Sequence, residues 1–189
     1  MSKEEIVICV ENEQELISRL QSPKSRDNAF RELMGLYKER LYWHIRKMVI
    51  SHDDTDDVLQ NTFIKVYRNI DKFKGQSKLF SWMYRIATNE AITFINQRAK
   101  RHQQSTEESQ MFMVNNLTAD VYFEGDEIQL KLQKAIASLP QKQQLVFNMK
   151  YFEDLKYKDM SEILETSEGA LKASYHLAVK KIEAYLTAD

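Results

Sequence analysis

Cations and aromatic side chains alternate around Gly75, near the middle of this 189-residue chain. They occur in the order Lys72, Phe73, Lys74, Lys78, Phe80, Trp82, Tyr84 and Arg85. Unpaired bases stack on aromatic faces with about 1 to 3 kcal/mol each, and nearby cations hold the phosphate backbone. The stretch is therefore typical of a site for single-stranded nucleic acid. Because Phe80, Trp82 and Tyr84 cannot all point to one side of a helix, some of them are expected in the core.

Carboxylates cluster ahead of an apolar run that ends near Tyr67, at positions Asp53, Asp54, Asp56 and Asp57. Carboxylates suit the positive end of a helix and accept hydrogen bonds from its unpaired amides, so a helix is expected to begin here. Four of them exceed what one helix start requires, which leaves a protein-binding surface as a second interpretation. The glycine and glutamate of a calcium-binding EF-hand loop do not fall at the required positions.

The end of the chain has the spacing of a helix-turn-helix. A short helix from Tyr157 to Leu164 is followed by a turn, and Ser167 can cap the longer helix after it. In such motifs the N-terminal part of the second helix enters the major groove of DNA. Its outer face is expected to carry Lys172, Ala173, His176, Lys180 and Lys181. An ordinary helical hairpin has the same spacing, so both interpretations stay open here.

The elements that position these groups are expected to be helices. Only 4 glycines and 2 prolines punctuate the chain, which favours long helices and an all-α fold. Apolar residues at helical spacing predict helices over Glu11–Leu20, over Asn28–Val49, after Asp53, and after an N-cap at Ser77. We predict an N-terminal extension with a short helix (1–25), a helical domain (26–102), an acidic flexible linker without regular periodicity (103–125) and a second helical domain (126–189).

Composition excludes several classes. The single Cys9 cannot form a disulfide framework within the chain, and the scattered histidines share no metal-ligand spacing, so no metal or other cofactor is expected. No apolar run reaches the length of a membrane span, and Glu4 and Glu5 do not suit a signal peptide, which favours a cytoplasmic protein that does not insert into membranes. No nucleophile and base pair or phosphate-binding loop occurs, so an enzyme is not expected.

Charge is segregated along the chain. Residues 68–102 carry 8 Lys plus Arg against 2 Asp plus Glu, and residues 103–130 carry 0 against 6. The net charge of −1 makes indiscriminate binding to nucleic acid unfavourable, because non-specific affinity scales with the number of phosphates neutralised. Any contact with DNA is expected to be local or assisted by a partner.

The order of these segments resembles that of a sigma factor of the extracytoplasmic-function (ECF) group of RNA polymerase. The resemblance covers nearly the whole chain and rests on LYKERLYWHIRKMV, DTDDVLQNTFIKVYRNIDKFKGQSKLFSWMYRIATNEAI, the acidic linker, and LPQKQQLVFNMKYFEDLKYKDMSEILETSEGALKASYHLAVKKI. It implies a protein that binds core RNA polymerase, directs it to promoter DNA and promotes melting. It also implies that an anti-sigma factor holds the protein inactive by covering the polymerase-binding face.

The resemblance assigns three sets of residues. The surface that docks on the clamp helices of the polymerase would contain Asp56, Asp57, Gln60, Asn61, Phe63 and Val66. Contacts to the minus-ten element would come from Asn69, Lys72, Phe73, Lys74, Lys78, Phe80, Trp82, Arg85, Asn89, Arg98 and Arg101. Contacts to the minus-thirty-five duplex would come from Ser167, Glu168, Lys172, Ala173, His176 and Lys180.

The chain departs from the family pattern in its helix-turn-helix. Lys156 and Glu165 stand where relatives often carry a small capping serine and a turn glycine, and Ser174, Leu177 and Val179 replace arginines that are common in the recognition helix. Two alternatives from other function classes also stay open. One is a stand-alone helix-turn-helix regulator that binds duplex DNA, and the other is a helical adaptor protein that binds no nucleic acid.

Overall fold

The chain is helical throughout the part that the computed structural model describes, residues 13–115 and 126–188, and no strand occurs in these two ranges. The first half contains α2 (Glu13–Gln21), α3 (Arg26–Val49), α4 (His52–Asn69), the short turn η1 (Ile70–Lys72) and α5 (Leu79–Arg101). The second half contains α6 (Thr106–Asn115), α7 (Glu127–Ala137), α8 (Gln141–Phe147), the π-helical turn η3 (Asn148–Phe152), α9 (Tyr157–Leu164) and α10 (Glu168–Thr187). The all-α prediction is confirmed.

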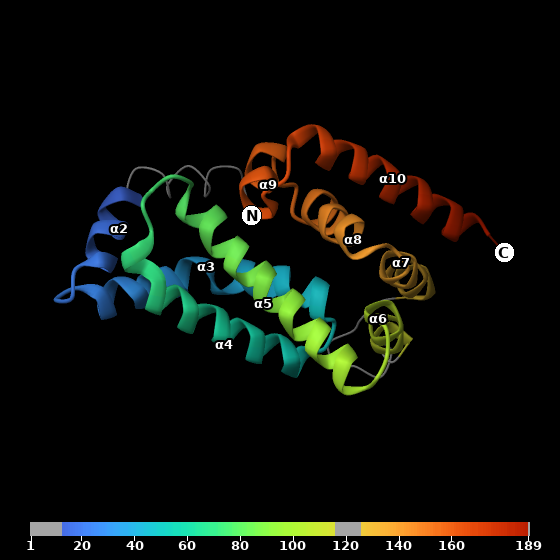
Figure 1. Cartoon of the computed structure of the whole chain (residues 1–189), viewed down its shortest axis with the longest axis horizontal. Helices are drawn as coiled ribbons and strands as arrows, with labels where there is room; N and C mark the ends of the chain where they lie inside the picture. The colour runs from blue at the N-terminus through green and yellow to red at the C-terminus, as the bar shows by residue number, and fades with distance from the viewer. Residues whose placement is uncertain (1–12, 116–125, 189) are drawn as a thin grey trace.

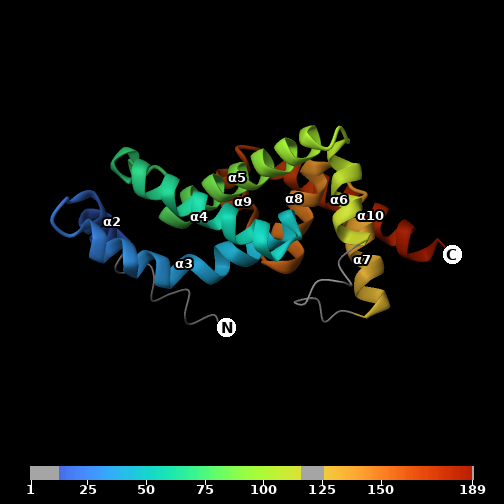
Figure 2. The same ribbon diagram turned by 90° about the horizontal axis from the view of Figure 1, so that it is seen from below.

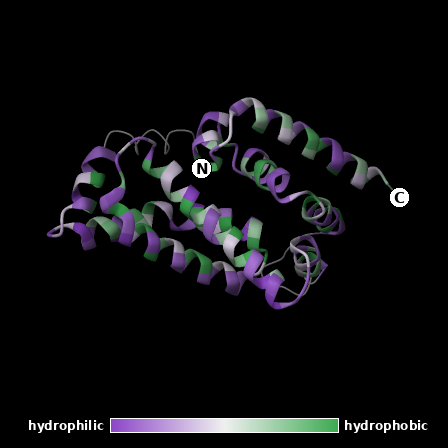
Figure 3. Cartoon of the chain, viewed as in Figure 1, coloured by the Kyte–Doolittle hydropathy of each residue, from purple (hydrophilic) through white to green (hydrophobic). Residues whose placement is uncertain are grey.

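Helices α3, α4 and α5 pack against one another and form the N-terminal bundle (Figures 1 and 2). Hydrophobic residues recur between hydrophilic ones along each helix (Figure 3), and fully buried Leu33, Ile45, Val66 and Met83 fill the space between the helices. This is the 3.6-residue periodicity that the sequence showed.

Helix α2 is part of the same bundle. Its Leu16 and Leu20 are buried in the common core. The Gln21 side-chain amide donates to the carbonyl oxygens of Ile70 (3.1 Å) and Phe73 (2.8 Å), so α2 fixes the loop that leads into α5. Residues 13–21 therefore belong structurally with the bundle, although the sequence placed them in an extension. Residues 1–12, which include the predicted start of this helix, lie outside the described part.

Helix α5 begins differently from the prediction. The N-cap position is Lys78 rather than Ser77, and its side chain makes no capping hydrogen bond. The Leu79 amide instead donates to the Glu13 carboxylate at 2.9 Å. A side chain from α2 thus supplies the acceptor that the sequence assigned to a local serine, so the Ser77 prediction was wrong.

Helix α6 overturns part of the predicted linker. Residues 106–115 form a helix, which begins with a reciprocal pair: the Glu108 amide donates to Ser105 Oγ (3.1 Å), and the Ser105 amide donates to the Glu108 carboxylate (2.8 Å). This is a capping box, a local signal for a helix start that is present in the sequence. Val114 is buried in a small cluster with Ile50 and Ala137, so α6 contacts both halves of the chain. The remainder of the predicted linker, residues 116–125, is outside the described part.

The helix-turn-helix prediction is confirmed in its local details. The Ala170 amide donates to Ser167 Oγ at 3.4 Å, which makes Ser167 the cap of α10. Lys156, at the start of α9, makes no side-chain cap. Glu165 ends α9 with a φ of 49°, a left-handed conformation that usually favours glycine or asparagine.

Replacing Ser167 with alanine is expected to lower the free energy of unfolding by about 1 kcal/mol, because the first turn of α10 loses its side-chain acceptor. Urea titration followed by circular dichroism measures the change. Ser77→Ala is the matched control and should change stability much less, since α5 is capped by Glu13. Equal losses in the two variants would contradict the assignment of the caps.

The two halves share one continuous core. Leu145, Met149, Met160, Ile163 and Leu171 of the second half belong to the same buried cluster as the residues of the N-terminal bundle. Helix α9 packs against α5 (Figure 1). The two predicted domains are therefore docked on each other. Among the described residues, no helix combines the length and apolar character needed to cross a membrane.

Candidate protein and nucleic-acid interfaces

The acidic cluster divides into two parts at the start of α4. Ser51 caps the helix by accepting from the Asp54 amide at 3.4 Å, and the Asp54 carboxylate accepts from Arg98 on α5 at 2.5 Å. Asp56 and Asp57 are exposed one turn later. The first part thus serves the helix start and its packing, while the second part lies on the surface, which supports both interpretations of the cluster.

The predicted polymerase-binding set is partly buried. Asp56, Asp57, Gln60 and Asn61 are exposed on α4, and that agrees with a docking surface. Phe63 and Val66 are 5% and 0% exposed, so they belong to the core under that surface rather than to the surface itself. Apolar residues at helical spacing are expected either in the core or at a protein contact. The structure places Phe63 and Val66 in the core.

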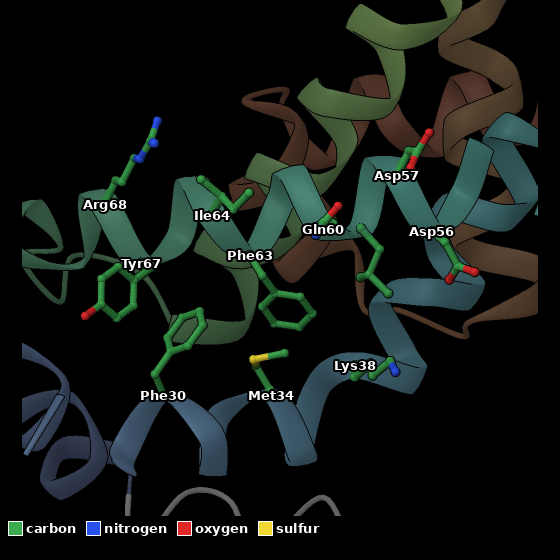
Figure 4. A pocket seen from close by; sticks show the side chains of 11 residues that line it. Phe30, Met34, Lys38, Asp56, Asp57, Gln60, Phe63, Ile64, Tyr67 and Arg68 are labelled. Atoms are coloured by element: carbon green, nitrogen blue, oxygen red, sulfur yellow. The ribbon is translucent and has the colours of Figure 1, made fainter. Parts of the chain in front are cut away.

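A groove of about 580 Å³ lies between α3 and α4 beside the acidic residues. The aromatic rings of Phe30, Phe63 and Tyr67 face one another along it, and Asp56 and Asp57 stand at one end (Figure 4). The Phe30 ring meets the Tyr67 ring edge to face at a centroid distance of 5.0 Å. An apolar groove with carboxylates at its end suits an amphipathic helix that carries a basic residue.

The aromatic side chains near Gly75 pack in pairs. The Phe73 ring is buried and lies 5.2 Å from the Trp82 ring, measured between centroids. The Phe80 ring lies 4.1 Å from that of Tyr84 and 4.8 Å from the Arg40 guanidinium. Trp82 and Phe80 are half-buried, and Phe73 and Tyr84 are core residues. The expectation that some of these rings belong to the core is confirmed.

The predicted minus-ten set falls into two groups. Around the start of α5 lie Asn69, Lys72, Phe73, Lys74, Lys78, Phe80, Trp82 and Arg85, while Asn89 lies in the middle of this helix. Arg98 and Arg101 lie at the other end of α5, about 30 Å from Lys78 at 1.5 Å of rise per residue. Arg98 is also bonded to Asp54. The structure therefore does not bring these two arginines close to the aromatic residues at the start of α5.

The predicted minus-thirty-five residues share one exposed surface. Ser167, Glu168, Lys172, Ala173, His176 and Lys180 are all exposed at or along α10. The Lys172 ammonium lies 5.5 Å from the centroid of the Tyr157 ring, so α9 orients this cation. The arrangement leaves the N-terminal half of α10 open to a duplex, as the motif requires.

A buried polar contact joins the two domains and was not expected from the sequence. Glu153, which follows η3, accepts at 3.0 Å through Oε1 from His44 Nδ1, and His44 Nε2 lies 2.9 Å from Thr88 Oγ1. Burial by itself would raise the pKa of Glu153, but nearby His44, Lys47 and Arg40 together lower it below its ordinary value. The Asn148 side chain adds a bond of 3.2 Å to the carbonyl of Lys47.

Two further ion pairs also connect the domains. Lys78 Nζ lies 2.7 Å from Asp159 Oδ1, and Arg85 Nη1 lies 2.7 Å from Glu165 Oε1. Both cations belong to the predicted minus-ten set. Three neighbouring residues of α3 face different partners here: Tyr42 contacts His52 of α4, His44 faces α5 and Glu153, and Trp43 is 51% exposed.

Two family descriptions match this chain. "Sigma-70 region 2" matches residues 33–101, which span the acidic surface of α4 and the cation–aromatic stretch. "Sigma-70, region 4" matches residues 129–182, which span the helix-turn-helix. Together they cover more than half of the chain, in the order that the resemblance predicted.

Curated relatives are similar to this chain along most of its length. The ECF RNA polymerase sigma factor SigW of Bacillus subtilis is 29% identical over 164 residues, 82% of this chain and 88% of that protein. The RNA polymerase sigma-H factor of Pseudomonas aeruginosa is 28% identical over 188 residues, 95% and 96% of the two chains. The ECF RNA polymerase sigma-E factor of Haemophilus influenzae is 28% identical over 179 residues, 90% and 93% of the two chains.

Solved structures show the same fold. CnrH, in complex with the cytosolic domain of CnrY, superposes with a TM-score of 0.68 at 20% identity and covers 94% of this chain and 98% of its own. The sigma factor RpoE, in complex with the anti-sigma factor NepR from Bartonella quintana, gives 0.62 at 19% identity and covers 85% and 98%. With regions 2 and 4 in their family order and relatives that match nearly end to end, the chain belongs to the ECF group of RNA polymerase sigma factors.

Proposed function

We propose that this protein binds core RNA polymerase, directs it to specific promoters and promotes strand opening. The observation that carries the proposal is that each family region presents a surface suited to one of these tasks. Region 2 combines an exposed acidic face on α4 with the cation–aromatic stretch at the start of α5, and region 4 presents the exposed face of α10. The bond-forming chemistry would belong to the polymerase.

The proposed polymerase contact uses Asp56, Asp57, Gln60 and Asn61, with Phe63 and Val66 supporting them from beneath. Exposed carboxylates at one end of an apolar groove give a partner helix both a hydrophobic contact and a charge that sets its direction. The solved relatives are complexes with the cytosolic domain of CnrY and with the anti-sigma factor NepR. We therefore also propose that an anti-sigma factor covers this face, and that the protein acts in the cytoplasm.

The proposed DNA contacts lie on two surfaces. Bases of the minus-ten strand would stack on the half-buried Trp82 and Phe80 rings, while Lys72 and Lys74 hold the phosphates. Because stacking on protein replaces stacking within the duplex, such contacts offset part of the energy of opening. The minus-thirty-five duplex would meet Lys172, His176 and Lys180 on α10.

A promoter-opening assay tests the function. Core polymerase is incubated with and without this protein on a library of upstream sequences, and unpaired thymines are scored by permanganate reactivity. Opening is expected only when both proteins are present. Duplex binding by the protein alone, without opening, would instead support a stand-alone helix-turn-helix regulator.

Charge reversal at the stacking site tests the adaptor alternative in the same assay. Lys72→Glu/Lys74→Glu is expected to reduce opening strongly, since both cations are exposed beside the aromatic rings. Glu127→Lys/Glu183→Lys, at exposed acidic positions of α7 and α10, is the control for the effect of charge reversal on folding. Full opening by the Lys72→Glu/Lys74→Glu variant would favour an adaptor that uses this surface for protein contact.

A further inference from the structure

The half of the chain that carries the helix-turn-helix contains no arginine. None follows Arg101 in the sequence, so lysine supplies every permanent positive charge of residues 129–182, the match to sigma-70 region 4. Arginine reads guanine through two hydrogen bonds to its O6 and N7 atoms, the commonest base-specific contact in the major groove. Lysine, a point charge on a flexible stem, suits phosphate. A different kind of contact must therefore distinguish the bases along α10.

An apolar row runs along the exposed side of α10. Gly169, Ala173 and Leu177 follow one another at intervals of four residues, so they lie on one face of the helix, and all three are exposed. Leu177 is 49% exposed, and among the residues of α10, all of which the structure describes, it is the one exposed large apolar side chain. The buried side of α10 comes from other residues, Leu171 and Ala178 among them. The core of region 4 therefore does not account for a leucine at position 177.

Thymine is the base that offers an apolar group in the major groove. Its C5-methyl projects into the groove, where small and apolar side chains contact it. Gly169 and Ala173 carry little or no side chain, so the N-terminal half of α10 can come close to the base edges. Leu177, one turn further on, reaches beyond them. Contact between this side chain and a thymine methyl would remove apolar area of both from water, which is favourable.

The cations of α10 form a neighbouring row. Lys172, His176 and Lys180 also recur every four residues, and all three are exposed. The Lys172 ammonium lies 5.5 Å from the centroid of the Tyr157 ring, which places it on the side of α9. One helix can thus hold phosphates with its lysine row, which fixes its position on the duplex, while the apolar row meets the bases.

We propose that this protein reads A·T pairs of its minus-thirty-five element through the methyl groups of thymine, with Leu177 as the specificity-determining contact. The small face at Gly169 and Ala173 lets the helix approach, and Lys172 and Lys180 hold the flanking phosphates. This inference rests on the function proposed above, because it names the chemical group that the duplex-binding surface of α10 recognises.

Replacement of thymine by deoxyuridine isolates the methyl group, because deoxyuridine pairs with adenine in the same way and lacks only the C5-methyl. The holoenzyme of core polymerase and the full-length chain is bound to a fluorescein-labelled promoter that opens in the assay above. Each thymine of the upstream element is replaced in turn, and affinity is measured by competition anisotropy. Binding should weaken about fourfold for each contacted methyl that is removed. Unchanged affinity at every thymine would overturn the inference.

Leu177→Ala identifies the side chain that makes the contact. In this variant the loss caused by deoxyuridine at the contacted position should fall below about twofold, because the methyl has no leucine to meet. Ile128→Ala is the matched control, since Ile128 is a large apolar residue of α7 that is 75% exposed and lies outside α10. The control should keep the full loss. A full loss in Leu177→Ala as well would assign the methyl to another residue and contradict the role of Leu177.

Leu177→Arg should change the preferred base. The exposed position accepts a guanidinium without damage to the core, and arginine there can bond to guanine. When the contacted A·T pair is replaced by G·C, this variant should favour the new promoter by at least roughly fivefold, whereas the unaltered chain favours the original one. The same preference in both proteins would mean that position 177 does not face this base pair, and the inference would be wrong.

The inference and the proposed function fail separately. Promoters that open without any effect of deoxyuridine leave the function intact and overturn only the inference. If the holoenzyme opens no promoter, the proposed function fails, and the same substitutions are made in duplexes that the free chain selects from the library. This second arm is possible because Leu177 and the lysine row are exposed in the free chain. A free chain that selects no duplex would overturn the inference too.

Discussion

Replacing His44 with alanine is expected to shift the protein from the docked to the separated arrangement of its two regions. The substitution leaves the Glu153 carboxylate, whose side chain is 9% exposed, without its hydrogen-bonded partner at 3.0 Å. Removing one member of a buried pair costs about 3 to 5 kcal/mol, roughly a hundredfold or more in the docking equilibrium. Undocking returns Glu153 to water, so this cost opens the chain. Small-angle X-ray scattering should show a clear rise in the radius of gyration.

The double variant His44→Ala/Glu153→Ala is the control for the cavity that alanine leaves at position 44. Because the double variant also removes the buried Glu153 carboxylate, its two regions should dock better than those of His44→Ala alone. The difference gives the coupling energy of the double-mutant cycle. Additive effects of the two substitutions would contradict a direct interaction.

Acid should loosen the same interface. Docking lowers the pKa of Glu153 below its ordinary value near 4.5, so its contribution is complete above that value and is lost as the pH falls through the lower pKa of the docked state. Glu153→Gln should remove this part of the pH dependence.

Charge reversal at Asp56 and Asp57 is expected to remove most of the affinity for core polymerase. Both carboxylates are exposed at the end of the apolar groove (Figure 4), where a basic partner group would meet them. In Asp56→Lys/Asp57→Lys that attraction becomes repulsion, and charge pairs at interfaces contribute about 2 to 5 kcal/mol when one partner is removed. Titration of fluorescently labelled protein with core polymerase should show a loss of at least roughly thirtyfold.

Two comparisons make this result specific. Asp56→Asn/Asp57→Asn should lose less affinity, since the attraction is removed without repulsion. Glu127→Lys/Glu183→Lys carries the same change in net charge on α7 and α10 and should bind nearly as well as the unaltered chain. If the reversal at Asp56 and Asp57 leaves affinity unchanged, the polymerase contact lies elsewhere.

Local patterns were sufficient for the helices and for the helix-turn-helix. Apolar spacing predicted α3, α4 and α5, and Ser167 was identified as a cap, because periodicity and capping involve residues within one or two turns. The same kind of signal was present for α6, where Ser105 and Glu108 form a capping box, but polar composition obscured it. The resemblance to sigma factors came from local motifs in order, and the family matches confirm it.

Only the packing of the helices decided which residues of the predicted polymerase-binding set are exposed. Asp57 and Phe63 belong to the same predicted set on α4, yet Asp57 is on the surface and Phe63 is in the core, because the Phe63 ring packs against Phe30 of α3. The resemblance grouped Arg98 with Lys78, but the length of α5 separates them and Arg98 is paired with Asp54.

The sequence by itself determined the helices, their order and the family, since each of these depends on residues close together in the chain. Only the tertiary structure decided that the two regions dock and which side chains hold them. His44 and Glu153 are 109 residues apart, and no periodicity connects them. Their contact exists because α5 packs on both α3 and α9, which brings distant polar groups into one buried site where each must find a partner.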